Sequence, residues 1–357
     1  MNNKIKLSIF FILIIFFGFT KGFSKPIPPG SGEGDVPANI LILLDSSKSM
    51  KNLVSGSNYM GLTGVDSIVE LSDGNLIVAE SKKGFVKILT ANNEIDRTFA
   101  QNKVRFRGKN RDPNCNNKDS TVKSSWAMDI RSNDVIYAGV YDDGGKIVAF
   151  DSDGKCVDVI KKSTTGIAMP RMLEIREIGG QEILFVSGRT HERRKKRGKF
   201  YVYNFATGKG KKCSVSGTLD QTLKNESAMS MTIDRNGNYV YFGRNNNIWS
   251  FPLTADADNI YCPSAGTHLI LNTRTNRIQS AAITNTISNI NQIHAIEYSR
   301  DTDNIIYAAS KHSHTLQKIE LDDTNVTASV LVTAGQHGSK NDADPGTISA
   351  ADVKLDQ

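Results

Sequence analysis

From residue 66 onward the chain repeats one pattern of apolar and polar positions five times. Each copy has an apolar strand, a turn containing Asp, Asn or Gly, and a second strand of Ile, Val, Tyr or Phe that ends in small residues. A third strand and another polar turn follow. Short apolar stretches bounded by turn residues are typical of β-strands. The second strands align at Val78, Tyr137, Phe185, Tyr241 and Tyr307, with spacings of 59, 48, 56 and 66 residues.

Repeats of about 40–65 residues that each hold three or four strands indicate a β-propeller, with one blade per repeat. Small residues at the end of each second strand fit a crowded approach to a central channel. A β-sandwich or a β-helix is the alternative. A β-helix would have shorter, more uniform coils, and a sandwich would not repeat one pattern five times. We therefore predict a mainly β fold in which residues 61–357 form about five blades.

Residues 1–24 have the pattern of a secretory signal peptide. Lys4 and Lys6 precede an apolar run from Leu7 to Phe19, and Gly22-Phe23-Ser24 supplies small residues for a cleavage site. A membrane anchor is the alternative, but a helix of this length rises only about 20 Å, less than the ~30 Å hydrocarbon core. We expect export to the periplasm, the cell surface or the extracellular space, with no membrane span left after cleavage.

Residues 25–37 hold four of the nine prolines and are expected to be a flexible linker. The apolar run Ala38–Leu44 that follows suits a strand buried on both faces of a parallel sheet. It leads directly into Asp45, Ser47 and Ser49 at alternate positions. A carboxylate and two hydroxyls beyond such a strand suit a divalent cation with oxygen ligands, although an ordinary polar turn is the alternative.

This segment resembles the von Willebrand factor A family, whose metal-ion-dependent adhesion site opens with D-x-S-x-S after such a strand. The resemblance implies Mg²⁺ or a similar cation, with Ser47 and Ser49 as direct ligands and Asp45 acting mainly through water. It is local, because residues 51–65 are turn-like where the family has a helix, and the later Thr and Asp ligands are missing. We assign residues 38–60 to a partial domain of this α/β type, represented by a single strand.

The C-terminal phrase Ala334-Gly335-Gln336-His337-Gly338, followed by Asp344, Gly346, Ala350 and Val353-Lys354-Leu355, resembles the linker of NHL-repeat propellers. In that family the linker leads into the first strand of the next blade, although here Pro345 interrupts the Asp-Gly pair. We therefore expect a propeller that is incomplete at its C-terminus, in a chain that is a fragment. Together the two resemblances are similar to exported proteins of type IV pilus assembly and tip adhesion.

Charge and cysteine content narrow the function classes. The chain has 44 Lys+Arg against 37 Asp+Glu, a net charge of +7, and part of this excess lies in residues 1–24. The remainder is too small to indicate nucleic acid. The four cysteines allow two disulfides in three connectivities, with free buried thiols as the alternative. They are Cys115, Cys156, Cys213 and Cys262.

Other polar groups each have a functional and a plain structural interpretation. The basic run His191–Lys199 is either a polyanion site or an exposed hairpin loop, and it lacks the interleaved aromatics that stack on bases. The remaining candidates are a metal pair (His312, His314), two calcium loops (Asp151–Gly154 and Asp256–Asn259) and two sugar-binding tryptophans (Trp126, Trp249). For these the plain alternatives are strand residues, hairpin turns and core between blades.

The leading hypothesis is an exported adhesion or pilus-assembly type binding protein without catalytic residues. The propeller would serve as an interaction platform, and a cation at Asp45, Ser47 and Ser49 would accept an acidic group of a protein or surface ligand. One alternative is an exported propeller enzyme, a lyase or dehydrogenase, with His and acidic residues at one channel mouth. The other is a propeller scaffold that needs no metal.

Overall fold

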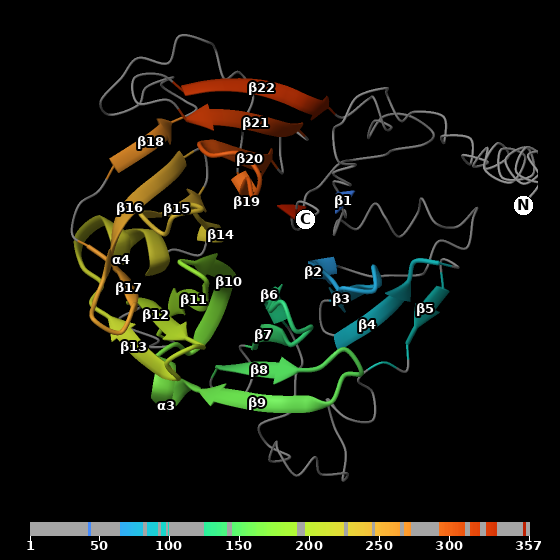
Figure 1. The fold of residues 1–357 in the computed structure, drawn as a ribbon. Coiled ribbons are helices and arrows are strands. Elements are labelled where there is room, and N and C mark those ends of the chain that lie inside the picture. Colours follow the sequence, from blue (N-terminus) through green and yellow to red (C-terminus); the bar gives the residue numbers. More distant parts are fainter. Residues whose placement is uncertain are drawn as a thin grey trace, which may run out of the picture. The chain divides into compact units, whose positions relative to one another are not determined.

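The computed structural model arranges its strands mainly in five antiparallel sheets, the blades of a β-propeller (Figure 1). All described residues belong to the unit Leu41–Gln357. They are residues 42–43, 65–80, 84–91, 94–97, 99, 125–140, 145–190, 197–224, 228–244, 247–264, 268–272, 293–310, 315–321, 326–333 and 353–354. The predicted mainly β propeller with about five blades is confirmed.

Each blade runs in chain order from an innermost to an outermost strand. Blade 1 consists of β2 (Val65–Glu70), β3 (Leu76–Glu80), β4 (Gly84–Leu89) and β5 (Glu94–Asp96), and blade 2 of β6 (Ser125–Ile130), β7 (Ile136–Val140), β8 (Lys146–Phe150) and β9 (Cys156–Lys161). Blade 3 consists of β10 (Met169–Ile178), β11 (Gln181–Arg189), β12 (Gly198–Asn204) and β13 (Lys209–Cys213).

Blade 4 has a divided outer edge, because two short strands pair with different parts of β16. It consists of β14 (Ala228–Ile233), β15 (Tyr239–Arg244), β16 (Asn247–Ala255), β17 (Tyr261–Pro263) and β18 (His268–Asn272). Blade 5 consists of β19 (Ile293–Tyr298), β20 (Ile305–Ser310), β21 (Thr315–Leu321) and β22 (Val326–Thr333). Two short helices, α3 (Lys162–Thr165) and α4 (Gly217–Lys224), follow the outer strands of blades 2 and 3.

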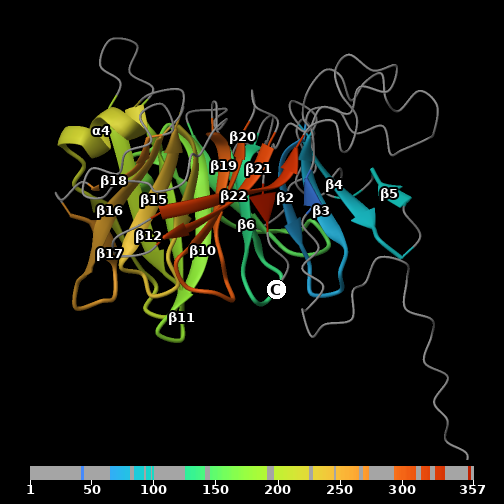
Figure 2. The same ribbon diagram turned by 90° about the horizontal axis from the view of Figure 1, so that it is seen from above.

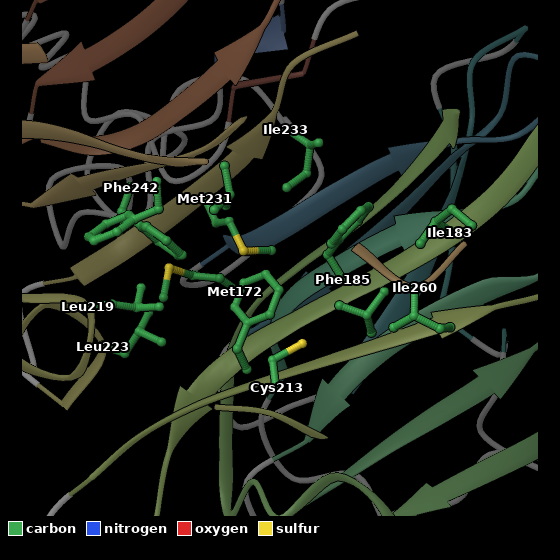
Figure 3. Close-up of a cluster of buried hydrophobic side chains, with 14 of the residues drawn as sticks. Met172, Ile183, Phe185, Cys213, Leu219, Leu223, Met231, Ile233, Phe242 and Ile260 are labelled. Carbon is green, nitrogen blue, oxygen red and sulfur yellow. The ribbon is translucent and has the colours of Figure 1, made fainter. Parts of the chain in front are cut away.

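The hydrophobic core consists of layers between neighbouring blades. Between blades 3 and 4, Phe185 and Phe200 of one sheet meet Phe242 of the next, and Leu219 and Leu223 of α4 cover the layer (Figure 3). Rings of Phe200 and Phe242 lie 6.3 Å apart in an edge-to-face arrangement. Burying one such side chain contributes about 1.5–3 kcal/mol, so each blade is stabilised mainly by its neighbours.

Small residues end the second strands because the next blade packs closely against them, as the sequence predicted. A Cβ atom on Gly139 would lie 3.1 Å from Pro170 of blade 3. One on Gly243 would lie 2.7 Å from Ile293 of blade 5. A larger side chain at either position would push two blades apart.

A β-bulge recurs near the start of the innermost strand in all five blades. The pairing with the second strand shifts by one residue at the same point of β2, β6, β10, β14 and β19. Counting from this bulge makes Ile77, not Val78, the blade 1 equivalent of Tyr137. The predicted alignment of the blades was therefore wrong by one residue in blade 1, because a bulge leaves no mark in the apolar pattern.

The segment expected to be a parallel strand pairs differently. In β1 (Ile42–Leu43), Ile42 lies opposite Lys354 and Leu43 opposite Val353 of β23 (Val353–Lys354), and the pairing is antiparallel. Strand β23 also contacts β19 and β20 of blade 5. The expected parallel neighbour is thus not found for the described part of residues 38–44. The remainder of residues 38–60 lies outside the described residues.

One disulfide joins the outer edges of two blades. Cys213 of β13 and Cys262 of β17 are bonded, so blade 3 is covalently tied to blade 4. The ion pairs Lys209–Asp258 and Lys211–Asp256, at 2.7 and 2.8 Å, connect the same edges. Cys156 is also disulfide-bonded, and Cys115 lies outside the described residues. The structure thus decides one pairing that the sequence had left open.

No helix in the described part of the chain is long and apolar enough to cross a membrane.

Removing this bridge should weaken the whole propeller. The double variant C213A/C262A should lose about 2–4 kcal/mol of unfolding free energy, because the bridge closes a loop with a sequence separation of 49 residues. Urea denaturation of the oxidised wild type and of the variant measures the difference, and the bond of Cys156 stays intact in both. An unchanged midpoint and slope would show that the bridge does not stabilise the contact between blades 3 and 4.

Candidate functional site

The innermost strand of each blade is a sheet edge, so some of its N–H groups need partners outside its own sheet. Polar side chains of the preceding blade supply these partners. Three such bonds use the same position in successive blades: Asp129, Glu174 and Thr232 accept the N–H groups of Ile175, Ile233 and Tyr298, at 2.7, 3.2 and 2.9 Å. Two further bonds come from serines: Ser67 and Ser230 accept from Met128 and Ile296, at 3.0 and 2.7 Å.

Two of these acceptors, Glu174 and Thr232, belong to a buried ionic cluster. Arg176 of β10 donates to Glu174 of the same strand at 2.7 Å and to Thr232 of blade 4 at 3.4 Å. It also lies 3.9 Å from Glu297 of blade 5. Burial alone would lower the pKa of Arg176, but Glu174 and Glu297 raise it above its usual value, so the guanidinium stays charged. The cluster therefore links three consecutive blades.

The charge balance of the cluster favours a structural role. The Oε1 atom of Glu174 accepts from Arg176, from the hydroxyl of Thr232 and from the N–H group of Ile233. Nearby, burial raises the pKa of Asp234 above its usual value. Within the described ranges, no group of three or more His, Cys, Asp or Glu side chains is placed to hold a metal ion.

The two loops considered for calcium are hairpin turns in which the first Asp binds its own backbone. Asp151 accepts the N–H groups of Asp153 and Lys155, at 3.1 and 2.8 Å. Asp256 accepts those of Asp258 and Ile260, at 3.0 and 3.1 Å. The hairpin-turn interpretation of Asp151–Gly154 is confirmed, and the polar loop Asp256–Asn259 is a turn of the same kind.

The two faces of the propeller are built differently (Figure 2). One face, here called the turn face, carries the short turns between first and second strands. Its turns are tied to the next blade: Ser72 N–H donates to Asp134 at 2.9 Å, and Ser132 N–H donates to Glu182 at 2.7 Å. The other face, here called the bulge face, is where the innermost strands begin, and α3 and α4 belong to it.

The five bulge positions have the same backbone but different residues. Their occupants, here called the bulge ring, are Asp66, Trp126, Arg171, Met229 and His294. Two residues further along, every innermost strand has a large aliphatic residue instead: Ile68, Met128, Leu173, Met231 and Ile296. Packing thus fixes the residue type inside the blade and leaves it variable at the bulge. Bulges commonly redirect side chains next to binding and active sites.

Most residues singled out in the sequence lie outside the described part. This applies to Asp45, Ser47 and Ser49, to His312 and His314, and to residues 191–196 of the basic run. Trp249 is partly buried against the core between blades 3 and 4, which confirms the core interpretation for this residue. Sequence reasoning missed the cluster of Asp129, Glu174, Arg176 and Glu297. The available signal was the alternation of the charged residues Glu174 and Arg176 with apolar ones in Leu173-Glu174-Ile175-Arg176 of β10.

Comparison with known proteins gives a likeness of fold only. No protein-family model and no curated protein sequence matches the chain. Among solved structures, it is similar to Kuenenia stuttgartiensis hydrazine synthase, with TM-score 0.44, 12% identity and 72% of each chain covered. It is also similar to the Dos1 propeller, with TM-score 0.42, 8% identity, and 76% of this chain and 60% of that chain covered. Neither likeness is close enough to indicate a function.

Replacing the buried arginine should destabilise the fold strongly. Arg176→Met leaves Glu174 buried without the Arg176 cation and Glu297 with Arg300 alone, so the unfolding free energy should fall by about 3–5 kcal/mol. Arg131→Met is the matched control, because its partner Glu182 lies at a more exposed edge of the sheet. It should lose no more than about 1–2 kcal/mol. Chemical denaturation measures the unfolding free energy of both variants. Equal small losses would contradict the inference that Arg176 stabilises the contact among three blades.

Proposed function

We propose that the protein is an exported binding protein without catalytic activity, which holds an acidic ligand at the bulge face of its propeller. The bulge ring is the observation on which this proposal depends. Five equivalent backbone positions carry five chemically different residues, whereas the position two residues further along each strand carries only large apolar ones. A repeated scaffold that varies at one end of its strands suits recognition more than packing.

The preference for an acidic ligand follows from the basic residues at blades 2 and 3 of this face, whereas blade 1 has Asp66 and Glu80 there. Arg171 occupies a bulge position, Arg189 ends β11 and Lys146 begins β8, so three cations lie at the bulge-face ends of blades 2 and 3. All three are buried. Cations in a region of low dielectric attract an anionic group more strongly than cations in water do.

Export is supported by the cysteine chemistry. Disulfides such as Cys213–Cys262 persist in oxidising compartments and are rare in the cytosol. The pattern of residues 1–24 adds a route to such a compartment. The cation site at Asp45, Ser47 and Ser49 stays a prediction that adds to this proposal, as does the pilus resemblance.

A second candidate, an exported enzyme, keeps one observation in its favour. Asp66 and His294 occupy bulge positions in blades 1 and 5, and these residue types serve as general acids and bases. A substrate changed by the protein would favour this alternative.

Export can be measured directly. Expressed with residues 1–24 in a bacterial host, the protein should appear in the exported fraction with Lys25 as its first residue and with Cys213 bonded to Cys262. N-terminal sequencing and non-reducing peptide mapping check both points. Lys4→Glu/Lys6→Glu should keep the protein in the cytosol, because the basic start of the signal is lost. Export of this variant at the wild-type level would contradict the signal assignment.

Ligand binding at the bulge face can be tested with a labelled glutamate-rich peptide and its glutamine counterpart. Arg171→Gln should weaken binding of the glutamate peptide by about tenfold, because a charge-assisted bond is lost. His294→Ala, at the equivalent position of blade 5, serves as a second variant if Arg171→Gln folds poorly. Arg235→Gln on the turn face is the matched control and should change affinity less than about twofold.

Fluorescence anisotropy measures these affinities. Equal binding of the two peptides, or equal effects of the Arg171 and Arg235 substitutions, would contradict the proposal. Mass spectrometry of the peptide after incubation distinguishes binding from catalysis, since a chemically altered peptide would support the enzyme alternative.

A further inference from the structure

Blades 2 and 3 meet at the bulge face in a group of lysines that the proposed acidic-ligand site does not use. Lys161 ends β9, Lys162 begins α3, Lys199 lies at the start of β12 and Lys212 lies near the end of β13. Lys161, Lys162 and Lys212 are exposed, and Lys199 is half-buried. These four residues are here called the lysine corner.

The fold brings these residues together from separate blades. Helix α3 contacts both β9 and β13. The Lys212 ammonium donates to the carbonyl oxygen of Ser163, next to Lys162, at 2.8 Å. In blade 3, Lys212 lies opposite Tyr201, which places it on the same sheet face as Lys199, two residues away along β12. Lysines far apart in the sequence thus share one surface.

On the opposite face of β13, two lysines are neutralised by carboxylates. Lys209 and Lys211 of β13 alternate with Lys212 and form ion pairs with Asp258 and Asp256 of blade 4. At the corner, by contrast, Lys212 binds a carbonyl group and no charge is cancelled by that bond. Asp220 of the nearby α4 is bound by Lys224 and by the N–H group of Gly198, and Asp158 lies further back on β9.

The described end of the basic run, residues 197–199, lies at the start of β12 beside this surface. Arg197, the arginine of the run that the structure describes, is exposed just before β12. The Arg197 N–H group donates to the Thr190 hydroxyl at 3.1 Å. The Thr190 N–H group donates to the Arg197 carbonyl at 3.0 Å. The two ends of the hairpin are therefore fixed next to Lys199.

We propose that the lysine corner binds an acidic polysaccharide. Each exposed cation contributes little alone, but several on one surface attract a polymer that carries many anionic groups. Nucleic acid fits less well, because Tyr201, the aromatic residue between Lys199 and Lys212 on this face, is buried and cannot stack on a base. A membrane fits less well too, because the exposed large hydrophobic residues of the described chain, Val157 and Tyr239, lie at the far end of β9 and in blade 4.

This inference rests on the exported location in the proposed function and adds a second ligand class to it. The experiment uses the mature chain and immobilised polygalacturonate, with neutral dextran as the blank, in a biosensor at several NaCl concentrations. Wild-type affinity should fall steadily as salt rises, because the contact is a screened electrostatic one.

Two double variants that remove the same charge test whether the lysine corner is the binding site. Lys162→Gln/Lys212→Gln should weaken binding by about tenfold, since each surface cation contributes several-fold. Lys209→Gln/Lys211→Gln removes the same charge from the same strand, on the neutralised face, and should change affinity less than about twofold. Lys162→Arg/Lys212→Arg should bind like the wild type. Thermal melting confirms that all three variants are folded.

Equal weakening by the two glutamine variants would overturn the proposal, and so would binding that ignores salt. Tighter binding to duplex DNA or to phosphatidylglycerol vesicles than to polygalacturonate would overturn the choice of polymer. Arg171→Gln should leave polygalacturonate binding unchanged, and Lys162→Gln/Lys212→Gln should leave peptide binding unchanged. The two proposals therefore fail separately.

Discussion

The free edge of each innermost strand is the constraint from which much of this structure follows. A sheet edge that faces the interior of a propeller has N–H groups that cannot all be left to water. In this protein blades 2, 3 and 4 each supply an acceptor side chain from the same position to the next blade, as Asp129 does for Ile175 and Glu174 for Ile233. The spacing and the rotation between neighbouring blades are set by these bonds, together with the apolar layers.

Carboxylates used in this way bring negative charge into a buried region. Arg176 offsets that charge, and its contacts with Glu174, Thr232 and Glu297 spread it over three blades. Such clusters are weak sources of net stability, yet removing one member is costly because the others stay buried. The architecture thus accounts for a charged group buried between these blades.

The two faces differ in how far hydrogen bonding restricts their residues. On the turn face, polar side chains are bound to the next blade, as in the bonds of Ser72 to Asp134 and Ser132 to Glu182. On the bulge face, the extra residue of each innermost strand takes no part in the ladder of its sheet. Residue type is therefore restricted by structure on one face and open to selection by ligands on the other. Both proposed binding surfaces, the bulge ring and the lysine corner, lie on the less restricted face.

The sequence by itself determined the strand repeat, the number of visible blades and the two Asp turns, because these depend on local periodicity and on short-range hydrogen bonds. Small residues such as Gly139 at the ends of second strands were also readable, since they reflect one recurring close approach. Only the tertiary structure decided the register of blade 1, the Cys213–Cys262 pairing, the antiparallel partner of Ile42–Leu43 and the meeting of Arg176 with Glu297. Each of these joins residues from different strands or blades, and the rotation between blades that brings them together is set by packing that no single repeat contains.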